Sequence, residues 1–186
     1  MAAGLGAEVV VLERSIPRMR ELDDMFLGRV LTRYSTLDVV EEEVLRADVV
    51  IGAVLTAGAA APKLVRREHL ARMKPGSVLV DVSIDQGGCF ETSRPTTHAD
   101  PTYVVDGVVH YCVANMPGAA PRTSSEALVH ATLPFGLALA DRGLDALKDD
   151  PHLARGLNVL RGELTHPAVA QALGRASVDP YGVWQA

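Results

Sequence analysis

The sequence predicts an α/β fold, a doubly wound parallel sheet followed by a C-terminal helical segment. Short apolar segments alternate with helical patterns at the spacing of βαβ units. One apolar segment, residues 78–82, leads directly into Asp85 and the pair Gly87-Gly88. Another, residues 102–113, contains Asp106-Gly107, a dipeptide favoured in two-residue hairpin turns, and predicts an antiparallel pair at one edge of the sheet.

The first 55 residues are expected to hold three strands and two helices. Gly4 and Gly6 precede the first apolar segment, so they predict the C-terminal turn of a helix, whereas a dinucleotide-binding glycine loop follows a strand and opens a helix. The remaining elements follow in order as a strand at 8–13, a helix at 17–26, a strand at 30–34, a helix capped by Ser35 and Asp38, and a buried strand at 48–55. The expected Rossmann-like domain is therefore truncated at its front.

The rest of the chain divides into two parts. Residues 67–73 are predicted to form a helix and residues 77–82 a strand covered on both faces. A capping box at residues 123–126 predicts the start of a long helix with Leu128, Ala131, Phe135 and Leu139 on one face. Beyond Asp141 short helices are expected at 144–148 and 167–173, without strands. We therefore expect a truncated nucleotide-binding domain at 1–121 and a segment at 122–186 that packs on something else.

Composition excludes several classes of function. The net charge is −5 and the basic residues are scattered, which argues against nucleic acid as a partner. No apolar run approaches the roughly 18 residues of a membrane span, and no secretory signal is visible, so cytoplasm is expected. Cys89 and Cys112 are predicted to be buried, reduced thiols. The six histidines lack the spacing of a metal site.

Acidic residues at strand ends are the main candidates for chemistry. Asp85 lies at the rim where open α/β sheets bind ligands, and it is either a general acid/base or ribose ligand or a turn former. Glu13 ends the strand whose terminal acid, in a Rossmann unit, binds the adenosine ribose and favours NAD over NADP, and the alternative is a solvated carboxylate at a strand end. In the segment 56–63, glycine and lysine suggest phosphate binding, but the P-loop spacing is not met and a plain rim loop is favoured.

Three long motifs resemble the alanine dehydrogenase family. They are V-L-V-D-V-S-I-D-Q-G-G-C-F at 78–90, E-T-S-R-P-T-T at 91–97 and H-Y-C-V-A-N-M-P at 110–117. Residues 47–55 and 61–65 match as well. The resemblance implies NAD-dependent, reversible oxidative deamination of L-alanine to pyruvate and ammonia in a cytoplasmic homohexamer.

The resemblance also implies site residues. Glu13 stands where the family has its ribose acid, usually Asp, while Val54 and Leu55 would line the cofactor cleft. Asp85 matches the acid near the nicotinamide and is expected to assist catalysis. Asn115 and Met116 match contacts to the nicotinamide side and the substrate.

The family's substrate domain and glycine loop have no counterpart in these residues, so the chain is expected to be a C-terminal fragment that is inactive alone. Two other classes stay open. One is a relative of the NAD-binding subunit of nicotinamide nucleotide transhydrogenase, which shares the fold. The other is a non-catalytic remnant that keeps only oligomer contacts.

Overall fold

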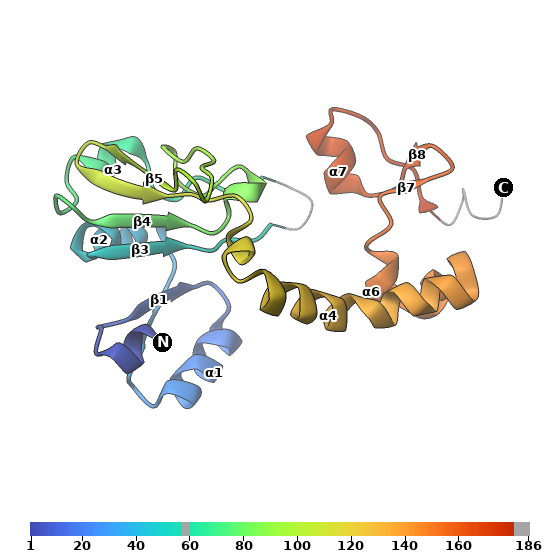
Figure 1. Ribbon diagram of the computed structural model, residues 1–186, viewed down its shortest axis with the longest axis horizontal. Helices are drawn as coiled ribbons and strands as arrows, with labels where there is room; N and C mark the ends of the chain where they lie inside the picture. The colour runs from blue at the N-terminus through green and yellow to red at the C-terminus, as the bar shows by residue number, and fades with distance from the viewer. Residues whose placement is uncertain (57–59, 181–186) are drawn as a thin grey trace. The chain divides into compact units, whose positions relative to one another are not determined.

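The computed structural model describes residues 1–56 and 60–180 and divides the chain into two compact units (Figure 1). The first unit contains Met1–Val54 and Pro62–Ala114, and the second contains Leu55–Ala61 and Asn115–Ala186. Residues 57–59 of the expected rim loop and the last residues of the expected C-terminal segment lie outside the described residues. The functional boundary expected at residue 121 stays a prediction, and each unit is considered by itself.

The first unit contains two sheets with parallel strands. The strands are β1 (Val10–Glu13), β2 (Leu31–Tyr34), β3 (Val49–Gly52), β4 (Val78–Asp81), β5 (Thr102–Val105) and β6 (Val108–Tyr111). One sheet pairs β1 with β2, and the other has the order β3-β4-β6-β5. All pairs are parallel except β5 with β6. The α/β class is therefore confirmed, although the strands form two sheets and not the single sheet that was expected.

The hairpin between β5 and β6 forms as predicted. Asp106 and Gly107 both have positive φ, 51° and 82°, which a two-residue turn between right-twisted strands requires. The turn places β5 at the edge of the sheet, antiparallel to β6.

The helices of the first unit begin close to their predicted positions. They are the 3₁₀ turn η1 (Ala2–Leu5), α1 (Ile16–Phe26), α2 (Leu37–Arg46), α3 (Arg67–Leu70) and the 3₁₀ turn η2 (Ile84–Gln86). Gly6 ends η1 in the left-handed conformation, as expected of a helix C-terminal turn. The cap of α2 was wrongly assigned to Ser35, because the Thr36 side chain accepts the Val39 N–H.

Two strands are more exposed than predicted. Val49 and Ile51 of β3 are 55% and 64% exposed, because they share one face of the strand and that face is largely uncovered. β4 was expected to be covered on both faces, yet only Leu79 and Asp81 are fully buried while Val82 is 50% exposed. Its apolar composition therefore reflects one buried and one half-buried face.

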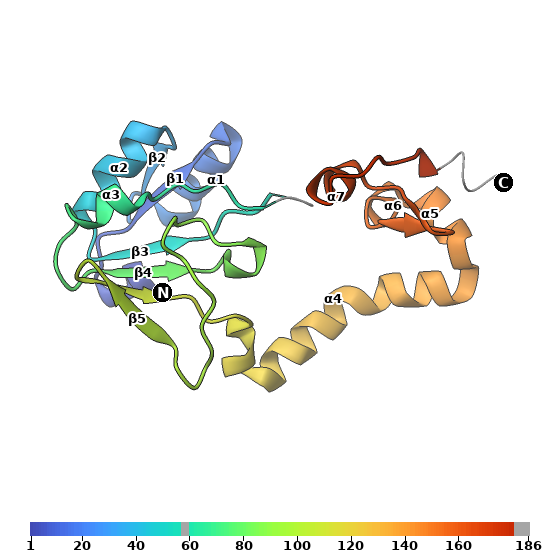
Figure 2. The same ribbon diagram turned by 90° about the horizontal axis from the view of Figure 1, so that it is seen from above.

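The second unit is mostly helical, with a small hairpin. Its elements are η3 (Met116–Ala119), α4 (Pro121–Arg142), η4 (Gly143–Asp145), α5 (Ala146–Asp149), α6 (Pro151–Ala154), β7 (Val159–Leu160), β8 (Glu163–Leu164) and α7 (Pro167–Ala172). Figure 2 shows α4 as one helix that bends along its length, and Pro134 lies inside it. No helix in the described part of the chain is long and apolar enough to cross a membrane.

Two predictions for the second unit were wrong. The helix α4 begins at Pro121, before the expected capping box, and Ser124 Oγ donates to the carbonyl of Pro117. Strands β7 and β8 form an antiparallel hairpin in a region predicted to have none. Their two-residue length explains why no alternating pattern was visible, and the turn residues Arg161 and Gly162 have positive φ.

Candidate functional site

The loop that follows β4 presents an exposed carboxylate at the carboxyl end of a parallel strand. We call residues 82–93 the β4 loop. Asp85 lies in its 3₁₀ turn η2 and is exposed. Gly87 and Gly88 then turn the backbone with φ of 85° and 73°, values that L side chains rarely adopt. This is the rim at which open α/β sheets bind ligands, so Asp85 lies where it was predicted.

Asp81 holds the β4 loop from inside. Its wholly buried carboxylate accepts the N–H groups of Ser83 at 3.0 Å, of Cys89 at 2.9 Å and of Phe90 at 3.4 Å. It also accepts the hydroxyl of Ser93. Because a buried carboxylate is stable only when its oxygens are hydrogen-bonded, Asp81 and the loop depend on each other.

The close approach of Asp81 explains why residue 88, the second glycine of the loop, has no side chain. A Cβ at Gly88 would lie 2.7 Å from Asp81 Oδ2 and 2.7 Å from Ser93 Cβ. No such contact surrounds Gly87, where a Cβ would have nothing within 4 Å. Gly88 is therefore required both by its φ and by the space around it.

Ser83 joins the β4 loop to the end of β3. Its hydroxyl accepts the N–H of Val54 and donates to the carbonyl of Val54, both at 2.8 Å. The structure thus joins one predicted site residue, Val54, to the loop that carries another, Asp85. Sequence reasoning missed Ser83, because its partners are backbone atoms 29 residues away.

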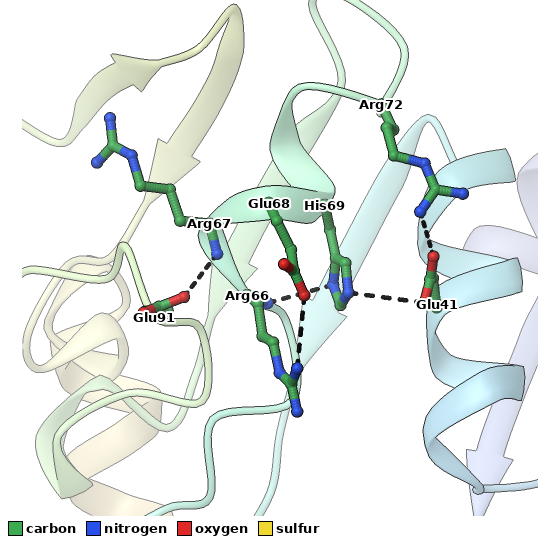
Figure 3. Close-up of polar contacts among 7 residues, drawn as sticks. All are labelled: Glu41, Arg66, Arg67, Glu68, His69, Arg72 and Glu91. Carbon is green, nitrogen blue, oxygen red and sulfur yellow. Dashed lines mark hydrogen bonds and ion pairs between the residues drawn. The ribbon is translucent and has the colours of Figure 1, made fainter.

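Residues 63–67 run along the outer side of the loop. Leu64 N–H donates to Cys89 O at 2.8 Å, and Glu91 N–H donates to Val65 O at 2.8 Å. Figure 3 shows the Glu91 carboxylate turned toward the start of α3, where it accepts the Arg67 N–H at 2.7 Å. These bonds fasten the far end of the β4 loop to the segment that leads into α3.

The same segment is tied to α2. Figure 3 shows His69 between Arg66 and Glu41: its Nδ1 accepts the Arg66 N–H at 3.2 Å, and its Nε2 lies 3.9 Å from Glu41 Oε2. Arg72 forms an ion pair with the same glutamate. The α3 turn is therefore anchored at both of its ends.

The hairpin supports the end of the β4 loop through His110 and Tyr103. His110 Nδ1 lies 3.0 Å from the carbonyl of Val108, so Nδ1 carries the proton and Nε2 accepts the Thr92 hydroxyl at 2.7 Å. Burial lowers the pKa of His110. The Tyr103 hydroxyl donates to Thr92 O and accepts the Arg94 N–H, both at 2.8 Å. His110 therefore has a structural role.

The two cysteines are free and buried, as predicted. Burial, together with the nearby Asp81 carboxylate, raises the pKa of Cys89 to about 12. Its thiol packs against the backbone of β3, where a Cβ at Gly52 would lie 2.2 Å from Cys89 Sγ. Cys89 is therefore a packing residue and not a nucleophile.

Glu13 ends β1, as predicted. Its Oε1 accepts the N–H groups of Ser15 at 2.9 Å and of Arg14 at 2.6 Å. These bonds lower the pKa of the Glu13 carboxyl, and the bond from Ser15 has the larger effect. A carboxylate that stays charged at the end of a strand fits a ribose ligand, although its role stays a prediction.

The other predicted residues belong to the second unit. Leu55 is 77% exposed. Asn115 adopts the left-handed conformation with φ of 58° and immediately precedes η3, which begins at Met116. Their assignment to the same site as Asp85 stays a prediction.

Parallel strands, crossover helices and an acid-bearing glycine loop at a strand end define a Rossmann-like NAD-binding fold. The family model "Alanine dehydrogenase/PNT, C-terminal domain" matches residues 1–167, and the chain belongs to that family. The alanine dehydrogenase of Halomonas elongata is 66% identical over 180 residues, 96% of this chain and 48% of that protein. That of Mycolicibacterium smegmatis is 55% identical over the same shares of both chains.

Solved structures agree with this assignment. An L-alanine dehydrogenase structure matches with a TM-score of 0.79 and 49% identity, over 94% of this chain and 48% of that chain. A transhydrogenase structure from Sinorhizobium meliloti matches with a TM-score of 0.66 and 25% identity, over 90% and 45%. The chain therefore spans about half the length of the relatives it matches.

Proposed function

We propose that this chain is the cofactor-binding part of an alanine dehydrogenase, which oxidises L-alanine with NAD and water to pyruvate, ammonia and NADH. The single observation that carries the proposal is Asp85, an exposed carboxylate on a tightly held glycine loop at the carboxyl end of β4. Identities of 52–66% to alanine dehydrogenases over nearly the whole chain support the same reaction.

The residues of the β4 loop fit the nicotinamide side of a dinucleotide. The family implies a nicotinamide cofactor, and Gly87, two residues after Asp85, leaves its backbone uncovered, since a Cβ there would have nothing within 4 Å. We assign Asp85 to the nicotinamide, Val54 and Leu55 to the cleft wall, and Asn115 and Met116 to the nicotinamide and substrate. When bound, NAD would accept a hydride from the substrate.

The opposite end of the cofactor is assigned to Glu13. Its charged carboxylate would accept the ribose hydroxyls of the adenosine and repel a 2′-phosphate, which favours NAD over NADP. Gly4 and Gly6 precede β1 and end a 3₁₀ turn, so this glycine pair offers no pyrophosphate cradle at a helix N-terminus. The phosphate contacts are therefore not assigned to that pair.

Two alternatives differ from this proposal in what they require. A relative of the transhydrogenase NAD-binding subunit would bind NAD without acting on alanine, and the 25% identity to the solved transhydrogenase favours it less than the dehydrogenases. A non-catalytic remnant would keep only oligomer contacts. The exposed side chains of Leu128, Val129, Leu133 and Leu137 on α4 are compatible with a homo-oligomer in either case.

Cofactor binding and alanine turnover separate these functions. Both are measured in a longer protein, in which this chain is completed with the upstream half of the Halomonas elongata relative. NADH fluorescence titration measures cofactor binding, and alanine-dependent NADH formation measures turnover. Binding with turnover supports the dehydrogenase, binding without turnover supports the transhydrogenase-like alternative, and neither supports the remnant. The expected cytoplasmic location and hexamer remain part of the proposal, and sedimentation measures the latter.

A further inference from the structure

Lys63 reaches across to the β4 loop and binds its backbone. Its Nζ lies 2.5 Å from Gly87 O, 2.8 Å from Gly88 O and 3.3 Å from Phe90 O. An ammonium group has three N–H donors, and here three carbonyl oxygens surround it. Such bonds from a charged donor are about twice as strong as neutral ones.

The loop geometry explains why these carbonyls converge. Gly87 and Gly88 follow the η2 turn with positive φ, so the backbone turns sharply there and their carbonyls lie outside any sheet ladder. On the inner side of the same loop, the N–H groups of Cys89 and Phe90 point at Asp81. The β4 loop is thus held between a buried anion that gathers N–H groups and a cation that gathers C=O groups.

Lys63 also lies on a segment that is itself fixed to the loop. Its neighbours Leu64 and Val65 bond to Cys89 O and to the Glu91 N–H. The ammonium group therefore acts from a rigid base and does not have to order its own backbone. A phosphate ligand at Lys63, which the sequence pattern suggested, would compete with three carbonyl bonds.

We propose that Lys63 is a positioning residue that fixes the conformation in which the β4 loop presents Asp85. The inference rests on the proposed function, because it assigns Lys63 to the reaction through the loop that carries Asp85. Lys63 reaches Gly87 and Gly88, which directly follow the η2 turn of Asp85. Without the cation, the two glycines regain their freedom and Asp85 loses its fixed direction.

The first test measures the loop itself. In Lys63→Met the amide protons of Gly88 and Cys89 should exchange with solvent about ten- to a hundredfold faster, as the loss of a charge-assisted bond to a local structure predicts. Lys74→Met is the matched control, since Lys74 pairs with Asp48 on the surface and not with this loop. Unchanged exchange in Lys63→Met overturns the inference.

A rescue experiment separates the ammonium group from general stability. n-Butylammonium added to Lys63→Ala should slow the exchange of these amides again, whereas tetramethylammonium, which has the charge but no N–H donor, should not. Equal effects of the two ions overturn the inference. If the variants fail to fold, hydrogen-bond couplings between Lys63 Nζ and the carbonyl carbons of Gly87 and Gly88 in the unmodified chain decide it, and their absence overturns it.

The last readout concerns the reaction. In the longer protein, Lys63→Met should lower kcat for alanine by about tenfold while KM changes little, because positioning acts on the reacting geometry. A kcat equal to that of Lys74→Met, despite faster loop exchange, overturns the positioning role. If the longer protein shows the loop effect but neither NADH binding nor turnover, the proposed function is contradicted, while the bonding of Lys63 to the loop stays supported.

Discussion

Asp81 and Asp85 lie four residues apart and have opposite surroundings. Asp81 is wholly buried and accepts backbone N–H groups, while Asp85 is exposed at the tip of the loop. The difference follows from their positions, because Asp81 is the last residue of β4 and Asp85 lies beyond the end of the strand. Substitutions of the two residues should therefore impair different properties of the protein.

Asp85→Asn is expected to reduce turnover and not stability. The exposed side chain makes no buried contact whose loss would unfold the chain, whereas removal of a general acid/base lowers kcat by about a hundredfold or more. Steady-state kinetics of the longer protein, with thermal unfolding as the control, measures both. Normal turnover would make Asp85 a turn residue, and an unfolded variant would make it structural.

Glu13→Ala is expected to weaken NADH binding and narrow the preference over NADPH. One lost charged contact is worth about 1.5 to 3 kcal/mol. Parallel titrations with NADH and NADPH measure the effect, and Asp38→Ala, on the first turn of α2, serves as a charge-matched control. An unchanged preference would remove Glu13 from the site.

Gly88→Ala is expected to destabilise the first unit more than Gly76→Ala does. Both glycines have positive φ, 73° and 84°, which costs alanine about 1–2 kcal/mol. Only at Gly88 does the new Cβ meet Asp81 and Ser93, and forcing an atom into packed surroundings adds about 1–3 kcal/mol. Chemical denaturation of the two variants compares them, and equal losses would show that the loop relaxes around the methyl group.

Several residues of the site could not be found from the sequence. Lys63, Ser83 and His110 act on backbone or hydroxyl groups that the fold brings from 18 to 29 residues away. Only Lys63 left a signal, a lysine near glycine in a rim loop, and that signal suggested phosphate. Asp85 was predictable because its position depends on one strand and its end.

At the level of elements, the residues that form turns were predicted more reliably than the lengths of strands and helices. The Asp106-Gly107 turn and the left-handed Gly6 follow from residue type alone. The strand predicted at 48–55 ends at Gly52, because the Val54 backbone bonds to Ser83 and not to a neighbouring strand. The capping box at 123–126 was overridden by Pro121, which is well suited to a helix N-terminus.

The hairpin should lose stability in mild acid. Burial lowers the pKa of His110 below its usual 6.5, so the unfolded chain binds a proton first as pH falls. The contribution is fully present above 6.5 and decreases from there toward the lower pKa of the folded state. Unfolding free energies at about pH 7.5 and about pH 5.5 should differ less in His110→Gln than in the unmodified chain. If the difference between the two pH values is the same in both proteins, His110 is not the source of the acid sensitivity.

On the scale of the whole molecule, the two units have unequal cores. Most of the fully buried side chains, among them Leu79, Phe90 and His110, belong to the first unit. In the second unit the apolar residues of α4 are exposed around the helix, including Leu128, Val129 and Leu133, so the single face predicted from the sequence was too narrow. A segment of this composition suits a surface that another domain or subunit covers.

The isolated 186-residue chain is expected to bind NADH weakly and to show no alanine turnover. Hydride transfer needs substrate and nicotinamide held at reacting distance, and that positioning is worth about 7 to 11 kcal/mol. The residues proposed for the site would contact only the nicotinamide side and the adenosine ribose, and Gly4 and Gly6 lie on the wrong side of a strand to cradle the pyrophosphate.

Incubating the purified chain with L-alanine and NAD, and following NADH absorbance, tests this expectation. The longer protein is the positive control, and the Asp85→Asn variant of the isolated chain distinguishes weak activity of the chain from a contaminant. Because the bonds of Asp81 and Lys63 to the β4 loop lie within the first unit, the loop structure should survive in the isolated chain even when turnover does not. Steady turnover by a verified 186-residue species, lost in Asp85→Asn, would mean that these residues already hold the substrate.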